Sequence, residues 1–336
     1  MIHIGLAGWG DHDDLYPDKA AAKNKLYTYS RYFPIVEVDS SFYAVQPQKN
    51  YAKWAGETPD SFGFVVKAYQ GMTGHLRGKP VYATREEMFT AFCKSMQPIV
   101  EAGKLRMVLF QYPPWFDCTR GNVAELRDAR ERMGDLPCAL EFRHQSWYAE
   151  DRLEQTIAFT AKERWIHTVC DEPQVMPGSV PFVLRATDDK QALVRFHGRH
   201  VMGWTQSGNG NWREVRYLYR YSRDELMEAA GKLKELEKMS EEVCVIFNNN
   251  SGGDAASNAA ELQAILRGSS DEPISHLPLQ RQGTRAAQEL RMREQLVGVE
   301  GESREHERAN DEVQGKREQE QKKDQPMQLD LFDDRL

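Results

Sequence analysis

Residues 139–147 read ALEFRHQSW, an apolar run that becomes charged within three positions. Side chains alternate along a β-strand, so Glu141 and Arg143 share one face with Ala139, whereas Leu140 and Phe142 share the other. Ionised groups that point into a protein interior are costly unless they are paired or used. Alone, the stretch fits either a structural Glu–Arg pair at a strand end or part of an active site.

Seven similar apolar runs accompany this one, mostly separated by segments with helical periodicity. The expected strands are 3–9, 35–42, 62–68, 106–112, 137–144, 165–171, 192–198 and 242–249. The expected helices are 21–33, 48–56, 84–103, 122–133, 151–163, 223–239 and 256–267, and the Pro-rich connection 172–190 lacks helical periodicity. This alternation predicts an α/β fold, a (β/α)₈ TIM-type barrel over residues 1–267 with a degraded sixth helix. An open doubly wound sheet is the alternative, but no glycine-rich dinucleotide motif follows the first strand.

The charge is spread unevenly along the 336 residues. Residues 268–336 hold 11 Lys/Arg and 16 Asp/Glu, a net of −5 out of the total −7, whereas residues 1–267 hold 33 and 35, a net of −2. Such a barrel is unlike non-specific nucleic-acid binders, which are usually strongly basic. Residues 268–325 are predicted to be a polar, flexible, mostly disordered linker. Apolar residues return in 326–336, which predicts a peptide that docks into a groove on another protein.

The expected location is the cytoplasm, without a membrane partner. No apolar run approaches the length of a membrane span, and the first residues lack the basic and apolar regions of a signal peptide. The five cysteines are odd in number, widely spaced and without a zinc motif. Cys138, Cys170 and Cys244 lie in apolar runs and are expected to be reduced core residues.

Polar or ionisable residues end seven of the eight predicted strands. In a TIM barrel the chemistry lies at the C-terminal ends of the strands, so this ring predicts a polar pocket. The residues are Trp9, Glu37, Asp39, Ser41, Tyr43, Lys67, Gln111, Glu141, Arg143, His144, Asp171, Arg195, His197, Arg199, Asn248 and Asn249.

Crowded carboxylates are the first chemical candidates in this ring. Crowding of like charges would raise the pKa of one of these carboxylates and create a general acid, or the group would bind a divalent cation. The members are Glu37, Asp39, Glu141 and Asp171. His197 is the candidate base or metal ligand. No nucleotide-cofactor motif is present, and the residues do not identify the metal.

Cations in the same ring are candidates for holding an anion. Arg195 and Arg199 flank His197 and would favour its neutral form. Lys67 and the arginines would hold a phosphate or carboxylate, although Lys67 fits equally well as a partner of Glu37. His167, in the middle of a strand, is expected to be a hydrogen-bonded core residue.

The segment 198–221 interleaves aromatic residues with arginines. Trp204, Trp212, Tyr217, Tyr219 and Tyr221 alternate with arginines, which suits stacking of bases or sugars together with phosphate contact. An ordinary lid whose aromatic rings pack on the barrel rim is the equal alternative.

The ordered motifs GLAGW, YFPIVEVDSSFY, FVVKAYQGMTGH, LFQYPPWF, ALEFRHQSW, VCDEP, VRFHGR and FNNNSGGDAASNAAEL resemble the YecE-like family (domain of unknown function 72) over about residues 3–267. The resemblance implies a TIM-type barrel with a pocket at the C-terminal strand ends, and it supplies no established reaction. The family motif positions fall on Glu37, Asp39, Ser40, Phe42, Tyr43, Lys67, His75, Gln111, Glu141, Arg143, Trp147, Asp171, Arg195, His197, Gly198, Arg199, Asn248 and Asn249.

The pentapeptide Gln328, Leu329, Asp330, Leu331, Phe332 resembles the bacterial sliding-clamp-binding motif. The resemblance implies that the Gln enters a small polar subsite while Leu and Phe fill an apolar pocket. The DNA polymerase sliding clamp is therefore the expected partner, bound with modest affinity because ordering of the tail opposes binding.

Three functional hypotheses follow. The leading one is a barrel enzyme, recruited to the clamp, that uses acid–base or metal-assisted chemistry on a phosphate-bearing or nucleic-acid-type substrate at the barrel mouth. Glu141, Asp171 and His197 are its main catalytic candidates, joined by Glu37 and Asp39. Substrate binding is assigned to Trp9, Tyr43, Lys67, Gln111, Arg143, Trp147, Arg195, Arg199, Asn248 and Asn249. The others are an enzyme for a small sugar or phosphorylated metabolite, favoured by the near-neutral barrel, and a non-enzymatic adaptor.

Overall fold

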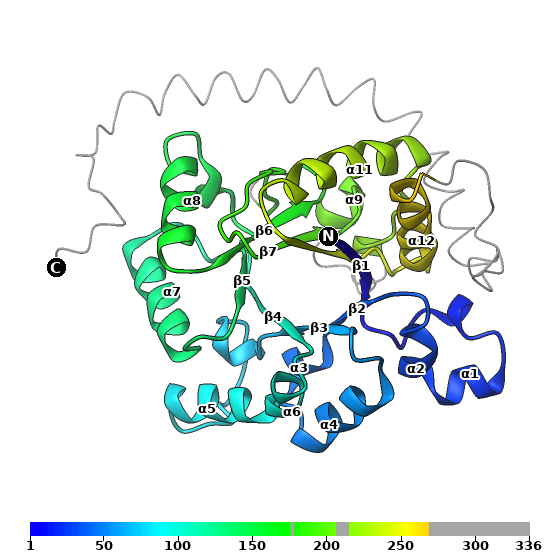
Figure 1. The fold of residues 1–336 in the computed structure, drawn as a ribbon. Coiled ribbons are helices and arrows are strands. Elements are labelled where there is room, and N and C mark those ends of the chain that lie inside the picture. Colours follow the sequence, from blue (N-terminus) through cyan, green and yellow to red (C-terminus); the bar gives the residue numbers. More distant parts are fainter. Residues whose placement is uncertain (176–177, 206–214, 269–336) are drawn as a thin grey trace. The chain divides into compact units, whose positions relative to one another are not determined.

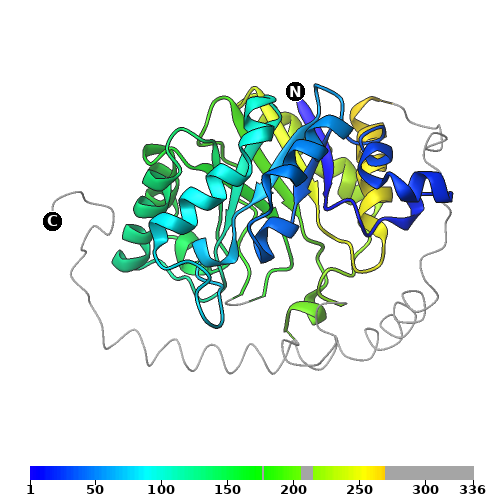
Figure 2. The same cartoon turned by 90° about the horizontal axis from the view of Figure 1, so that it is seen from below.

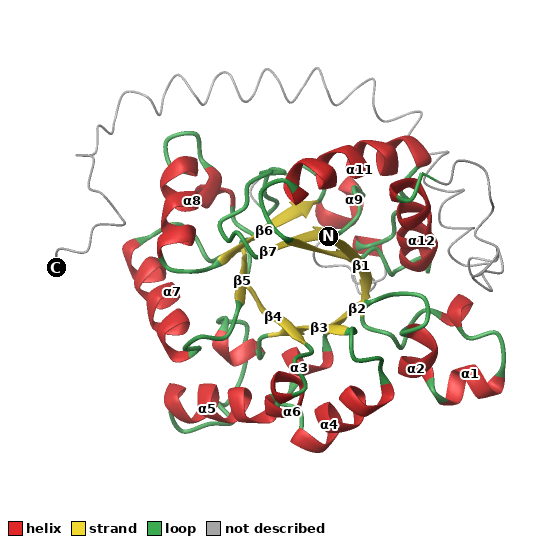
Figure 3. Ribbon diagram, viewed as in Figure 1, coloured by secondary structure: helices red, strands yellow, loops and turns green. Residues whose placement is uncertain are grey.

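A computed structural model describes residues 1–175, 178–205 and 215–268. Eight parallel strands close into a barrel in sequence order, with helices around the outside (Figures 1 and 3). The strands are β1 (Ile2–Ala7), β2 (Ile35–Val38), β3 (Gly63–Lys67), β4 (Leu105–Gln111), β5 (Cys138–Glu141), β6 (Ile166–Asp171), β7 (Gln191–Phe196) and β8 (Glu242–Phe247). The predicted TIM-type barrel is confirmed.

The helices of the described part lie mainly in the connections between strands. They are α1 (Lys19–Lys23), α2 (Lys25–Tyr29), α3 (Ser40–Tyr43), α4 (Gln48–Glu57), α5 (Arg85–Ser95), α6 (Gln97–Glu101), α7 (Arg120–Arg132), α8 (Leu153–Lys162), α9 (Val201–Thr205), α11 (Arg223–Glu237) and α12 (Asp254–Leu266). Single 3₁₀ turns occur at Asp13–Leu15, Gln70–Met72 and Gln145–Tyr148. The described residues between β6 and β7 form no helix, which confirms the degraded sixth helix.

The barrel closes where β1 pairs with β8, from Ile2 beside Val243 to Leu6 beside Phe247. On its other side β1 packs so closely against β2 that a Cβ on Gly5 would lie 2.0 Å from the Ile35 carbonyl oxygen. Only glycine fits this approach. The interior is filled by one apolar cluster: Ala7, Ile35, Val65, Met107, Leu109, Ala139, Ile166, Leu193, Cys244 and Ile246.

Several predicted elements differ from the structure. The expected helix 21–33 is divided into α1 and α2 with Asn24 between them, and the expected strand 137–144 ends at Glu141. The expected strand 35–42 ends at Val38, and α3 begins at Ser40, whose neighbour Ser41 donates its hydroxyl hydrogen bond to backbone carbonyls of Val38 and Lys67. The expected helix 84–103 is divided into α5 and α6, with Pro98 in the first turn of α6. Proline has no N–H to continue a helix and is favoured at a helix start.

The sequence beyond Gly268 lies outside the described residues. Three expectations therefore remain predictions: the linker 268–325 from its second residue on, the peptide 326–336, and the motif Gln328, Leu329, Asp330, Leu331 and Phe332. Within the described part, every helix is too short or too polar to cross a bilayer.

Candidate functional site: a buried charged layer at the barrel mouth

A layer of polar side chains covers the apolar core at the C-terminal ends of the strands. Inward-facing positions alternate, so the strands that bury Ile35, Leu109, Ala139 and Leu193 place Glu37, Gln111, Glu141 and Arg195 two residues further on. In Figure 2, the short α9 lies below this end of the barrel. Glu37, Glu141, Arg195 and His197 all have 0% exposed surface. The predicted convergence of charged groups is thus present for these four residues.

Arg195 joins two of the acids. Its Nε and Nη2 donate to the two carboxylate oxygens of Glu37 at 2.9 and 2.6 Å, while Nη1 donates to Glu141 Oε2 at 2.7 Å. This bidentate arrangement fixes both carboxylates in position. Burial of the three charges is offset only because they are mutually paired.

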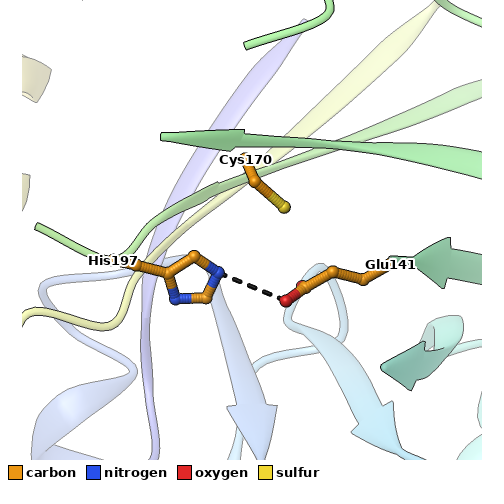
Figure 4. A group of neighbouring side chains, drawn as sticks. All are labelled: Glu141, Cys170 and His197. Carbon is orange, nitrogen blue, oxygen red and sulfur yellow. Dashed lines mark ion pairs between the residues drawn. The ribbon is translucent and has the colours of Figure 1, made fainter. Parts of the chain in front are cut away.

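Glu141 is the most connected acid. Its Oε1 accepts a hydrogen bond from Gln111 and forms an ion pair with Arg143, whose Nε is 3.0 Å away. His197 Nε2 lies 3.3 Å from the same oxygen (Figure 4). Because the Asn248 amide donates to His197 Nδ1 at 3.0 Å, the imidazole proton is on Nε2 and faces Glu141. The expected sharing of a face by Glu141 and Arg143 is confirmed.

The pKa values separate the two buried acids. Burial raises the pKa of Glu37 to about 7, against the opposing effect of Arg195, and the neighbouring Asp39 carboxylate raises it further. Burial would also raise the pKa of Glu141, but Arg195, Arg143 and His197 hold it well below its ordinary value. Glu141 is therefore a permanent carboxylate, whereas Glu37 changes its protonation near neutral pH.

His197 is neutral. Burial lowers its pKa well below 6.5, and Arg143 and Arg195 act in the same direction. The neutral form was predicted from Arg195 and Arg199, but the main cause is burial, and Arg143 takes the place of Arg199. With so low a pKa the imidazole is a weak base at neutral pH, and its hydrogen bonds assign it to holding Glu141.

Asp39 and Lys67 connect this layer to solvent. Lys67 Nζ lies 3.5 Å from Asp39 Oδ1, and the two side chains are 14% and 35% exposed, respectively. Within the described part of the chain, Lys67 thus forms its ion pair with Asp39 and not with Glu37. Asp39 and Lys67 both influence the pKa of Glu37 and both reach solvent, and Asp39 is the more exposed of the two.

Glu172 belongs to the same layer and was not predicted. Its carboxylate bonds Arg143 and accepts the backbone N–H of Val180 at 2.6 Å. Burial raises the pKa of Glu172 to about 7, although Arg143 opposes this. The alternation that turns Cys170 inward also turns Glu172 inward; the sequence shows that the two share a face, but not that this face is the inner one.

A divalent cation fits this layer poorly. Within the described part of the chain, one group of residues has potential metal-ligand atoms within 4.8 Å of one another: Glu141, Cys170 and His197 (Figure 4). Arg195 and Arg143 already bind the Glu141 oxygens, and Arg195 Nη1 lies 3.4 Å from His197 Nε2. Burial raises the pKa of the Cys170 thiol well above its usual range, and the neighbouring acids add to this, so forming a thiolate ligand would require the loss of a strongly held proton.

Asp171 is not part of the layer, contrary to the prediction. Because Cys170 faces inward, the next residue faces outward, where Asp171 binds Arg199 through Nε and Nη2 and accepts from the Tyr221 hydroxyl at 2.8 Å. Arg199 also bonds Glu225. The two residues form a structural pair that fixes the segment following β7.

Two predicted substrate-binding residues, Trp147 and Asn249, are buried structural residues, and a third, Trp9, is half-buried. Trp147 is buried, stacks on Phe142 and donates its indole N–H to the Phe116 carbonyl. Asn249 is buried and donates to Tyr219 and Asn258. Trp9 packs edge-on against Trp54 of α4. His167, by contrast, is confirmed as a buried core residue bonded to the Val183 carbonyl.

The aromatic residues of segment 198–221 that the structure describes pack inward. Trp204 is buried with Arg143 and Arg216 at 5.0 and 4.1 Å from its ring, and Tyr221 is buried against Phe196 and Phe247. The packed-lid alternative therefore holds for these rings. Trp212 and Arg213 lie outside the described residues.

The fold and this layer define a TIM-type barrel with a buried, charge-rich layer at its mouth. The family profile called Protein of unknown function DUF72 matches residues 3–282, and the chain belongs to this family. It is 57% identical over 267 residues to UPF0759 protein YunF of Bacillus subtilis, covering 79% of this chain and 95% of that protein. It is 23% identical to UPF0759 protein YecE of Escherichia coli, covering 59% and 69%.

Solved structures of the same family share the fold. A DUF72 family protein from Enterococcus faecalis is 38% identical with a TM-score of 0.75, and the match covers 81% of this chain and 98% of that one. A DUF72 family protein from Thermotoga maritima is 30% identical with a TM-score of 0.68, covering 80% and 99%. The resemblance stated from the sequence motifs is confirmed.

Proposed function

We propose that the barrel is an enzyme that uses acid–base chemistry on a phosphate-bearing or nucleic-acid-type substrate. One observation carries this proposal. Glu37, a buried acid with a pKa of about 7, lies beside Asp39 and Lys67, which reach solvent at the barrel mouth. A group with a pKa near the working pH is the most effective proton donor and acceptor.

The roles follow from the contacts. Asp39 and Lys67 meet the substrate, Lys67 by attracting an anionic group and Asp39 by exchanging a proton with it and with Glu37. Arg195 is a positioning residue, because it has no exposed surface and holds Glu37 with two hydrogen bonds. Glu141, Asp171 and His197 are held by their own contacts with Arg143, Arg199 and one another, so Glu37 and Asp39 take the acid–base role.

The test is turnover by the purified full chain, assayed on single-stranded DNA, damaged DNA and a panel of phosphorylated sugars. Glu37→Gln should lower kcat about 100-fold or more, which is the usual contribution of a general acid. Glu57→Gln is the matched control, because Glu57 makes an exposed pair with Lys53 on α4. Absence of turnover on every substrate, or equal rates for both variants, rules out the acid–base role.

A small phosphorylated metabolite is the second candidate substrate. The net charge of −2 on residues 1–267 favours it over an extended nucleic acid, which requires a basic track. Thermal stabilisation by sugar phosphates, without stabilisation by oligonucleotides, would select this candidate.

We further propose that the tail recruits the barrel to the DNA sliding clamp. The support is the motif Gln328 to Phe332 near the end of a long polar segment, where the tether would raise the local concentration of the barrel at DNA. Phe332→Ala should abolish retention of the full chain on immobilised clamp, while Phe332→Leu should retain part of it. Unchanged retention of the Phe332→Ala variant would remove this assignment.

A further inference from the structure

Exposed aromatic rings occur at the barrel mouth, where the sequence predicted Tyr43 but not Trp115. Tyr43 at the end of α3 is 65% exposed, and Trp115 in the connection after β4 is 55% exposed. Both follow the C-terminal end of a strand, as does His75 in the connection after β3. Large apolar rings left in water beside a polar mouth are a frequent mark of a binding surface.

These rings form one continuous row. Phe42 packs edge-on against Tyr43 at 5.3 Å and against His75 at 5.1 Å, and His75 packs edge-on against Trp115 at 5.9 Å between ring centroids. The Thr73 hydroxyl lies 2.9 Å from His75 Nδ1 and fixes the orientation of that ring. We call Phe42, Tyr43, His75 and Trp115 the aromatic rim.

Cations lie on both sides of the rim. Lys67 Nζ is 5.1 Å from the Phe42 ring, and the Arg77 guanidinium is 5.5 Å from the Trp115 ring. His75 adds no charge, because burial together with Lys67, Arg143 and Arg77 lowers its pKa to about 4. The rim therefore offers neutral rings for stacking, bordered by two groups that attract an anion.

We propose that the aromatic rim binds a nucleotide, with its base stacked on Trp115 and its phosphate between Arg77 and Lys67. This inference rests on the proposed function, because it places the sugar-phosphate beside Asp39, the partner of Lys67. Base stacking needs an exposed aromatic face and tolerates any base, whereas phosphate needs a local cation. A free nucleotide and a nucleotide within a single strand share this chemistry.

The rim suits one nucleotide better than a duplex or a bare sugar phosphate. The barrel carries a net charge of −2, so a long phosphate backbone finds no extended basic track. A sugar phosphate would leave the exposed face of Trp115 unused. The occupant predicted by both features is a single base with its phosphate.

The test measures affinity of the full-length protein for AMP, dAMP, a fluorescent oligo(dT) and ribose 5-phosphate. Calorimetry serves the small molecules, and anisotropy serves the oligonucleotide. Trp115→Ala should weaken binding of the base-containing ligands about 10-fold or more. Arg77→Gln should weaken them by a smaller factor and reduce the dependence on salt. The controls are Tyr27→Ala and Arg31→Gln, an exposed aromatic on α2 and an exposed arginine away from the mouth.

Comparison of the ligands identifies the source of the nucleotide. Tighter binding of oligo(dT) than of AMP or dAMP indicates a nucleotide within a strand, and the reverse order indicates a free nucleotide. Equal affinity for ribose 5-phosphate and AMP, no nucleotide binding, or unchanged affinity of Trp115→Ala overturns the inference.

The same variants separate this inference from the proposed function. Nucleotide binding that depends on Trp115 but leads to no turnover leaves the rim assigned and refutes the acid–base role. Turnover that requires Glu37 but is unchanged in Trp115→Ala, in KM as well as kcat, retains the enzyme and refutes the rim.

Discussion

Replacing Arg195 by Met removes the charge that holds the buried layer together while keeping most of the side-chain volume. Glu37 and Glu141 would then be buried without their shared guanidinium. Removal of one partner from a buried ion pair costs about 3–5 kcal/mol. For a barrel of this size roughly 2–4 °C is lost per kcal/mol, so the Tm should fall by roughly 6–20 °C at pH 8.

The loss should depend on pH. Without Arg195 the pKa of Glu37 in the folded state rises further and that of Glu141 rises from its lowered value, so the folded variant binds protons that the folded wild type has released. Its stability relative to wild type therefore falls as the pH rises from about 5 to 8. Adding Glu37→Gln to Arg195→Met should recover part of the loss, because one unpaired charge is gone.

Differential scanning fluorimetry from pH 5 to 8 measures this effect. Arg185→Met is the matched control, since Arg185 pairs with Glu154 at 3.7 Å and their side chains are 53% and 77% exposed. Its effect should stay below about 1 kcal/mol. A Tm of Arg195→Met within 2 °C of wild type, or a deficit equal at every pH, would refute the reasoning about buried charge.

Three other outcomes are expected. His197→Gln should have a lower free energy of unfolding in urea than wild type at pH 8. The difference should narrow from pH 7 to 5, because only wild-type His197 gains a proton on unfolding there, and a constant difference would contradict a neutral buried imidazole. EDTA should leave the Tm unchanged and Zn²⁺ should not raise it, whereas a shift of several degrees would show a metal in the charged layer. Gly198→Ala should lower the free energy of unfolding by more than about 1 kcal/mol, because Gly198 has φ +86° and a Cβ there would lie 2.6 Å from Tyr219 Cβ. The control Gly121→Ala lies in helix α7 with open space around it, so its stability should be unchanged or higher.

The barrel was predictable because its signals are local. Each strand is a short apolar run bounded by turn residues or helical periodicity, and eight of them in alternation leave few topologies. The end of β2 was misplaced because Ser40 to Tyr43 has the residue types of a strand, while the short α3 is stabilised by hydrogen bonds from Ser41 to two separate strands. That tertiary contact leaves no local signal.

The candidate site was predictable where parity along a strand was clear. Glu141 follows Ala139 at a spacing of two, and both face inward as expected. Strand β6 is buried on both faces, so its composition did not show which face lines the interior. Asp171 was therefore taken as inward, and Glu172 was missed. The choice of Glu37 over Glu141 as the titrating acid depends on the number of guanidinium groups that reach each one, which only the packed structure shows.

The protonation of Glu37 is the property on which the proposed chemistry depends. It can be measured by ¹³C NMR of the full chain labelled at the Glu side-chain carboxyl carbons, titrated from pH 4 to 9, with Glu37→Gln and Glu172→Gln used for assignment. A resonance that titrates near pH 7 in wild type and disappears in Glu37→Gln is the predicted result. A Glu37 resonance that titrates below pH 5 would show a permanent carboxylate locked to Arg195 and would contradict an acid–base centre at the barrel mouth.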